Sequence, residues 1–188
     1  MTMTTGVPEE EVKQAMSILP PEAQEIFHRQ AIQDQRHGLA VYRSLCRAGH
    51  TNPELLAAGL LHDTGKVAAR LPSWQRAVIV LLDHFAPRLL ERLALQPSPR
   101  PSPEGREGDS RPVSVPKGWR RPFVVHAQHP QLGARWAEEA GCSALTVALI
   151  RRHHDPLASD SSIISSTTSV TTEENQLLAE LQMADNSN

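Results

Sequence analysis

Residues 53–66, Pro-Glu-Leu-Leu-Ala-Ala-Gly-Leu-Leu-His-Asp-Thr-Gly-Lys, give the clearest indication of the architecture. Asn52, just before them, is a residue type that caps helices, and Pro53 suits a first helical turn. The residues that follow are apolar on most sides, which predicts a helix in the middle of a helical core. This apolar pattern ends at His62. The adjacent imidazole and carboxylate of His62 and Asp63 are therefore expected at the end of a buried helix.

Apolar residues at three- and four-residue steps predict further helices on both sides of this stretch. A short helix is expected to begin at Pro8, and one long helix is expected over residues 22–48, with Gly49 as its stop. Later helices are expected over residues 73–82, 87–95, 130–140, 143–154 and 171–186. No convincing alternating strand pattern is present, so the fold class is predicted to be all-α, a bundle of about seven or eight helices.

Two segments interrupt the helical pattern. Residues 97–118 form a low-complexity, Pro-rich insertion, which cannot pack a core and is expected to be disordered. Residues 159–170 read as a Ser/Thr-rich loop, and a capping box at residues 171–174 is expected to start the last helix. At 188 residues, the chain is expected to form one domain over residues 1–188.

Composition excludes several classes of protein. Hydrophobic residues make up 39% of the chain and charged residues 21%, as in soluble globular proteins. The formal net charge of −2 predicts no dedicated nucleic-acid-binding surface. The longest apolar block, residues 77–82, is too short to span a membrane. Because Cys46 and Cys142 are the only cysteines and residues 1–14 do not read as a signal peptide, a cytoplasmic location is expected.

The histidines carry the chemical signal. The dipeptide of His62 and Asp63 is weak evidence by itself, since a capping or surface role is the commoner explanation for it. Most of the other candidates lie at predicted helix ends or beside apolar residues, where burying an unpaired polar group is costly and sharing a metal ion removes that cost. Seven candidate ligands result: His37, His62, Asp63, His129, His153, His154 and Asp185.

The order of these residues resembles the HD superfamily of metal-dependent phosphohydrolases, all-helical proteins with a His, then His-Asp, then a distant Asp. The matching segments are residues 34–37, 60–66 and 177–185. Further histidines in residues 129–133, His-Pro-Gln-Leu-Gly, and at positions 153–154 are similar to the histidine-rich branch that includes the HD-GYP proteins. The resemblance implies an HD-domain helical bundle.

The sequence departs from that branch at two points. The GYP segment is missing after His154, which argues against cyclic di-GMP as the substrate. Gln33 stands where a third metal would require a carboxylate, one turn before His37. The resemblance is therefore to a histidine-rich HD protein without the GYP segment and with at most two metals.

The resemblance also implies how the ligands divide between two metals. The first metal would be held by His37, His62, Asp63 and Asp185, and Asp63 would bridge to a second held by His129, His153 and His154. A carboxylate can share its oxygens between two cations about 3.5–4 Å apart, and such a pair activates water and holds phosphoryl oxygens. Iron or manganese is favoured, and magnesium, zinc, nickel or cobalt would also suit these ligands.

The catalytic residues implied are Asp63 and Lys66. Lys66 would meet a nonbridging phosphate oxygen by its charge, or else be an ordinary solvated lysine at a helix end. The implied function is a phosphomonoesterase or phosphodiesterase acting on a small nucleotide-like substrate through metal-activated water. The alternatives are a noncatalytic metal-binding signalling or ligand-binding module and, less favoured, a dinuclear-iron oxygenase.

Several roles stay open on sequence alone. His126 could reach the metal site as a ligand, but a structural or substrate-facing role is favoured, and Asp155 could cap a helix or orient a ligand. Asp34 could accept a hydrogen bond from an imidazole or form a plain surface pair. The remaining histidines, His28, His50 and His84, lack the family spacing and are expected to be exposed or ordinarily packed. The sequence does not determine the substrate, the metal or the oligomeric state.

Overall fold

A computed structural model describes residues 8–68, 81, 84–86, 121–155 and 168–188. Over these residues the chain forms seven α-helices and one 3₁₀ helix and no strand, so the all-α prediction is confirmed. The chain divides into two compact units, residues 1–67 with 130–188 and residues 68–129. The insertion at 97–118 and the helices expected at 73–82 and 87–95 lie outside the described residues, apart from Leu81.

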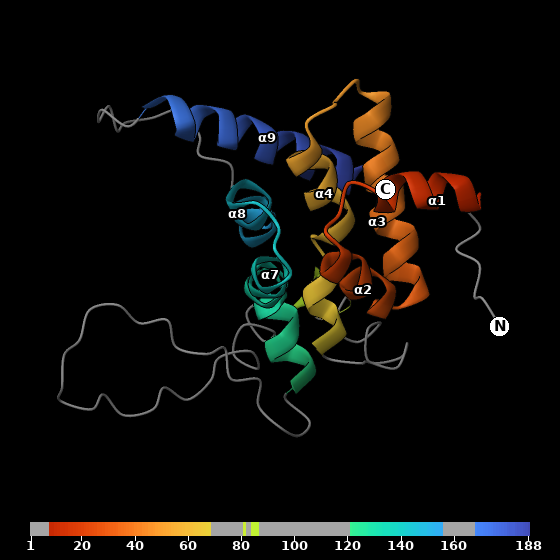
Figure 1. The fold of residues 1–188 in the computed structure, drawn as a ribbon. Coiled ribbons are helices and arrows are strands. Elements are labelled where there is room, and N and C mark those ends of the chain that lie inside the picture. The colour runs from red at the N-terminus through yellow and green to blue at the C-terminus, as the bar shows by residue number, and fades with distance from the viewer. Residues whose placement is uncertain (1–7, 69–80, 82–83, 87–120, 156–167) are drawn as a thin grey trace. The chain divides into compact units, whose positions relative to one another are not determined.

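The first unit contains six of the seven described α-helices in full (Figure 1). They are α1 (Glu9–Met16), α2 (Pro21–Arg29), α3 (Ile32–Arg47), α4 (Pro53–Leu61), α8 (Ala144–Arg152) and α9 (Thr168–Asn186). The 3₁₀ helix η1 (Thr64–Ala68) follows α4, and α7 (Arg121–Glu139) contains the unit boundary at Pro130. The prediction of one domain over residues 1–188 stays a prediction.

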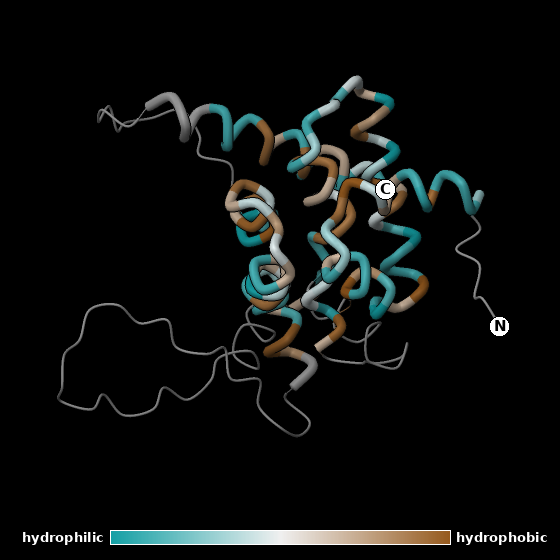
Figure 2. The backbone as a smooth tube through the Cα atoms, in the orientation of Figure 1, coloured by the Kyte–Doolittle hydropathy of each residue, from teal (hydrophilic) through white to brown (hydrophobic). Residues whose placement is uncertain are grey.

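Helix α4 is the centre of this unit, as its sequence predicts. The Asn52 side chain accepts a hydrogen bond from the Leu55 N–H at 3.0 Å, which caps the helix. Every residue from 55 to 61 is buried, because α4 contacts α3, α8 and α9. The outer helices α1 and α9 instead carry hydrophilic residues interrupted by hydrophobic ones (Figure 2). Because α3, α8 and α9 all contact it, α4 is enclosed by other helices.

The prediction of one helix over residues 22–48 is wrong, because α2 and α3 are separate helices. Gln30 and Ala31 between them have extended backbone conformations, with ψ angles of 155° and 149°. The Gln35 side-chain amide donates to the Gln30 carbonyl oxygen at 2.9 Å, which satisfies a backbone acceptor at the end of α2. No glycine or proline marks this break. The predicted stop at Gly49 is confirmed by its φ of 87°.

Two predicted helix starts are also wrong. Helix α7 begins at Arg121 rather than Pro130, which lies inside it. A proline lacks the N–H that would bond the carbonyl four residues earlier, here that of His126, and His129 Nδ1 lies 2.6 Å from this oxygen. Helix α9 begins at Thr168, so residues 168–170 are helical instead of loop. Several serines and threonines could begin α9, and the capping box at residues 171–174 is only one choice.

The backbones of helices α3 and α4 lie close together at Gly38. A Cβ atom there would lie 2.8 Å from the Leu60 carbonyl oxygen, which is backbone, whereas a Cβ atom at Gly59 would meet the flexible Leu45 side chain at 3.0 Å. We expect Gly38→Ala to lower the free energy of unfolding by about 1–3 kcal/mol through overpacking. Both glycines are helical, so both variants gain about 1 kcal/mol in helix propensity, which should largely offset only the smaller strain of Gly59→Ala. Urea unfolding of both variants tests this, and equal losses would contradict it.

Candidate metal centre

Three helices bring four predicted ligands together in the first unit. His37 comes from α3, His62 and Asp63 from the end of α4, and Asp185 from the last turn of α9. One ligand atom from each of His37, His62 and Asp63 lies within 4.8 Å of the other two, a group that could hold a metal ion. His62 and Asp63 are buried, with exposed fractions of 1% and 4%.

The distances suit ligands arranged around one ion. Asp185 Oδ1 lies 2.7 Å from His37 Nε2 and 3.4 Å from His62 Nε2. Asp63 Oδ2 lies 3.6 Å from His62 Nε2. Nitrogen and oxygen ligands about 2.0–2.2 Å from an ion stand about 3–3.5 Å apart at tetrahedral or octahedral angles. His62 Nε2 is buried and makes no hydrogen bond within the described residues, so this donor set fits a divalent metal.

The buried histidines share one backbone arrangement. Nδ1 of His62, His129 and His153 lies 3.0, 2.6 and 2.7 Å, respectively, from the carbonyl oxygen three residues earlier. When Nδ1 donates to a carbonyl oxygen, the lone pair is on Nε2. Metal-binding histidines are commonly oriented by such a bond from the other ring nitrogen. The local fold therefore presents Nε2 of each ring as the coordinating atom.

The charges at the centre favour an ionised Asp185 carboxylate. Burial alone would raise the pKa of Asp185, but its hydrogen bond with His37 and the positive charges of His62 and His37 lower it well below its usual range. Burial also acts to lower the pKa of His62, and the nearby Asp63 and Asp185 carboxylates more than reverse this, so that pKa is raised. The negative charge of the carboxylates would also attract a cation.

His153 is electrostatically different. Burial, with the neighbouring His62 and His154, lowers the pKa of His153 to about 3. The His62 and His153 ring centroids are 5.2 Å apart, so a second positive charge beside His62 is unfavourable. His153 is therefore neutral at neutral pH and can offer a nitrogen lone pair without first losing a proton.

This electrostatic difference predicts a titration. In metal-free protein, the ring signals of His153 should show a midpoint near pH 3 by NMR. Because the unfolded-state pKa is about 6.5, neutral His153 stabilises the fold above pH 6.5, and this contribution is lost as the pH falls towards 3. The signals that disappear in the His153→Asn variant are those of His153. A midpoint at or above pH 6 would contradict the electrostatic account of the centre.

Lys66 lies beside Asp63, the predicted bridging ligand. Its Nζ is 2.5 Å from Asp63 Oδ2, one turn away in the chain, and its side chain is 36% exposed. Lys66 is therefore neither fully solvated nor turned away from the cluster. The two residues predicted to be catalytic are therefore in direct contact.

His153 and His154 follow α8, and their ring centroids are 4.3 Å apart. His153 is buried and His154 is exposed. His129 lies in α7, four residues before Gly133 and so on the same side of the helix. A Cβ atom at Gly133 would lie only 3.1 Å from the Gly65 nitrogen. Joint binding of a second metal by His129, His153 and His154 stays a prediction.

The remaining histidines agree with their predicted ordinary roles. His28 and His84 are exposed, and His50 Nε2 pairs with Glu180 Oε2 at 3.2 Å. The His126 ring lies 6.0 Å from that of His129, centroid to centroid. Asp34 is buried, which is unusual for a plain surface acid.

Sequence reasoning missed Gln182. This side chain, one turn before Asp185 on α9, donates to backbone carbonyl oxygens of His153 and Asp155. The i,i+3 spacing from Asp185 was the available signal, since residues three apart share a helix face. Asp155 therefore contributes a backbone acceptor to the contact with Gln182, whereas its side-chain Oδ2 lies 3.6 Å from Arg152 Nε.

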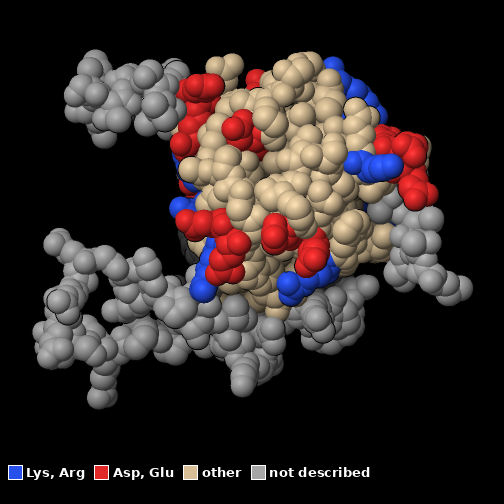
Figure 3. Space-filling model, viewed as in Figure 1, with Lys and Arg blue, Asp and Glu red and all other residues tan. Residues whose placement is uncertain are grey.

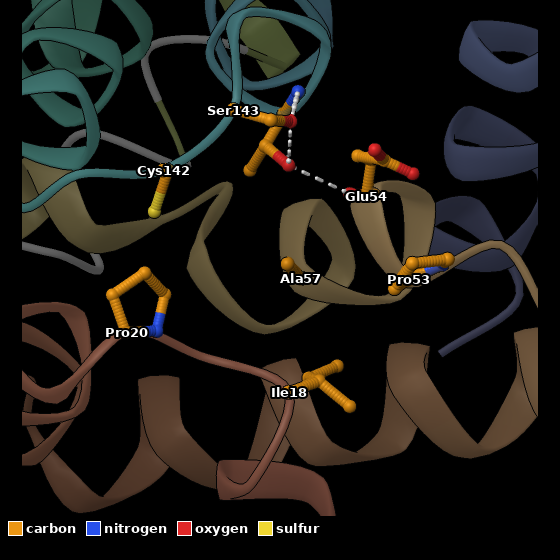
Figure 4. A pocket seen from close by; sticks show the side chains of 8 residues that line it. Ile18, Pro20, Pro53, Glu54, Ala57, Cys142 and Ser143 are labelled. Atoms are coloured by element: carbon orange, nitrogen blue, oxygen red, sulfur yellow. Dashed lines mark hydrogen bonds between the residues drawn. The ribbon is translucent and has the colours of Figure 1, made fainter.

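A cavity of about 190 Å³ lies at the other end of α4 (Figure 4). Its lining includes Ile18, Pro53, Ala57 and Cys142. Helix α4 begins here and ends at the candidate centre, about 13 Å away at 1.5 Å per residue. None of the candidate ligands lines this cavity, so it is separate from the metal centre.

No family model, curated protein or solved structure matches this chain. None of the described helices is both long enough and apolar enough to cross a membrane. Cys46 and Cys142 are both free thiols. On the face in Figure 3, acidic and basic side chains are interspersed over a largely uncharged surface. Because no known protein matches, the assignment of the centre rests on the residues of this chain alone.

Proposed function

We propose that the chain is a metal-dependent phosphohydrolase of the HD type, acting on a small nucleotide-like phosphomonoester or phosphodiester. One observation carries the proposal: imidazoles and carboxylates from three helices converge within the distances that one ion requires, with an ammonium group beside them. A purely structural ion pair would not need buried imidazoles oriented by backbone carbonyls. Iron or manganese is the favoured metal.

His37, His62, Asp63 and Asp185 would hold the metal. When bound, a divalent metal supplies the Lewis acidity that activates water and neutralises phosphoryl oxygens. The depressed pKa of Asp185 keeps its carboxylate ionised as a ligand across the neutral range. His153 and His154, with His129, are proposed to hold a second metal, and neutral His153 needs no deprotonation for this role.

Lys66 is proposed to bind the substrate phosphate. Its ammonium group is held beside Asp63 in the resting protein, and a phosphate oxygen bound at the centre would offer it a second negative partner. Such a charge, placed where negative charge develops, stabilises the transition state without acting as a base. Asp63 would position both the metal and this lysine.

The direct test is turnover. The purified chain is incubated with p-nitrophenyl phosphate, its bis ester and a panel of nucleotides and cyclic dinucleotides, with Mn²⁺ or Fe²⁺ added. Phosphate or p-nitrophenol release that stops with a chelator and returns with metal is the expected result. Metal binding without turnover of any compound would contradict the enzyme assignment.

A noncatalytic metal-binding module is the second candidate. The observation in its favour is the Lys66–Asp63 contact at 2.5 Å, since a lysine that serves only to balance the charge of this carboxylate needs no substrate phosphate. The Lys66→Met variant separates the two candidates. In the enzyme it should raise KM or lower kcat for every phosphorylated substrate that is turned over, whereas in the module it should only change metal affinity.

A further inference from the structure

The carbonyl groups at the end of α8 need hydrogen-bond donors. The last carbonyls of a helix have no partner within it. Here the Ile150 oxygen lies 2.7 Å from the His153 ring nitrogen Nδ1, and the Arg152 oxygen accepts from the Asp155 N–H at 2.7 Å. The carbonyl oxygens of His153 and Asp155 come next. They flank His154, so whatever binds them fixes the turn that carries both histidines.

Gln182 donates to both of these carbonyl oxygens. Its Nε2 lies 3.0 Å from the His153 oxygen and 2.8 Å from the Asp155 oxygen. A side-chain amide nitrogen carries two hydrogens, so each oxygen can receive one. This single group therefore satisfies both carbonyls of the turn.

Gln182 also lies on the helix that carries Asp185. The two residues are three apart in α9, and such residues lie on the same face. Leu181 next to Gln182 is fully buried, which anchors this part of α9 in the core. A rigid link thus runs from the anchored helix of Asp185 to the turn of His153 and His154.

From this link we infer that Gln182 is a positioning residue of the metal centre. Its amide holds the His153 and His154 turn at a fixed distance from Asp185, so that ligands from α8 and α9 are arranged before metal binds. The inference rests on the proposed metal-dependent function. Outer partners that orient ligands typically contribute 10–100-fold to metal affinity.

A neighbouring contact distinguishes positioning from general stabilisation. Arg152 bonds to Glu174 and Asn175, and so also ties α8 to α9. This contact does not involve the carbonyl groups of His153 or Asp155. Glu174→Gln therefore weakens the packing of the same two helices without removing the donors of the turn, and serves as the matched control.

The experiment measures Mn²⁺ affinity of the full chain by calorimetry, together with thermal unfolding of the metal-free protein. Gln182→Met keeps the length of the side chain but has no donor, Gln182→Glu keeps the shape but only accepts, and Gln182→Lys restores a donor. We expect about 10–100-fold weaker Mn²⁺ binding for the Met and Glu variants and recovery to within about 5-fold for Lys. Glu174→Gln should bind Mn²⁺ like the wild type.

Wild-type affinity in both Gln182→Met and Gln182→Glu would overturn the inference, as would an equal loss in Glu174→Gln. If Gln182→Met does not fold, the Glu and Lys variants are compared instead. Since only the lysine donates, equal Mn²⁺ affinities in these two variants would overturn the inference. A wild-type chain that binds none of Mn²⁺, Fe²⁺ and Zn²⁺ would instead reject the proposed function, and so the two failures are distinguishable. If the wild type binds Fe²⁺ or Zn²⁺ but not Mn²⁺, the same comparison of variants is made with that metal.

Discussion

Asp63→Ala is expected to remove bound metal and phosphohydrolase activity together. Asp63 is buried, lies 3.6 Å from His62 Nε2 and contacts Lys66. The change deletes a proposed ligand and leaves the lysine without its carboxylate. Loss of an outer partner typically costs 10–100-fold in metal affinity or activity, so loss of a ligand should cost at least about 100-fold in each. Elemental analysis and substrate turnover measure both effects.

The matched control is Glu138→Gln, which neutralises an exposed carboxylate on α7. It should keep the metal content and turnover of the wild type. Helical circular dichroism and a cooperative thermal transition establish that each variant folds. Unchanged metal stoichiometry in folded Asp63→Ala would contradict the assignment of Asp63 as a ligand.

Adding metal is expected to stabilise the fold by several kcal/mol. His37, the His62–Asp63 pair and Asp185 come from three different helices, so unfolding would separate them and release a bound ion. A ligand at 100 times its Kd that binds only the folded state raises the free energy of unfolding by about 2.7 kcal/mol. For a chain of this size that corresponds to a rise in Tm of about 5–10 °C. Differential scanning calorimetry with and without Mn²⁺ measures it.

A chelator should reverse the rise in Tm. The Asp185→Asn variant should lose most of it, because an amide is a poorer ligand for a hard divalent cation than a carboxylate. The exposed acid Glu138 again provides the control, since Glu138→Gln should retain the full shift. A Tm that does not respond to Mn²⁺, Fe²⁺ or Zn²⁺ in the wild type would be inconsistent with ligands gathered from separate helices.

Much of the fold could be predicted because its signals are local. The Asn52 cap, the apolar run of α4 and the glycine stop after α3 each depend on residues within one or two turns. The separation of α2 and α3 could not be predicted in this way. It depends on the Gln35 amide, which satisfies a carbonyl of the preceding helix, and no glycine or proline announces it. Pro130 had the opposite effect: it suggested the start of a helix, although it lies inside α7.

The order of the residues was enough to predict that the four proposed ligands of the first metal lie together. The structure brings His37, His62, Asp63 and Asp185 together, although 148 residues separate the first and last of them. The polar contacts around them could not be predicted. The orientation of His62 by the Gly59 carbonyl and the two bonds of Gln182 depend on how helix ends meet in space.

The most direct test of the centre is the metal content of the chain purified without chelators. The ligand set predicts at least one divalent metal ion per chain, iron or manganese being favoured, and two if His129, His153 and His154 hold a second. The measurement is elemental analysis set against protein concentration, on the wild type and on Asp63→Ala. Metal in the wild type and little in the variant is the predicted result. A metal-free wild type that takes up no Mn²⁺, Fe²⁺ or Zn²⁺ on addition would contradict the account.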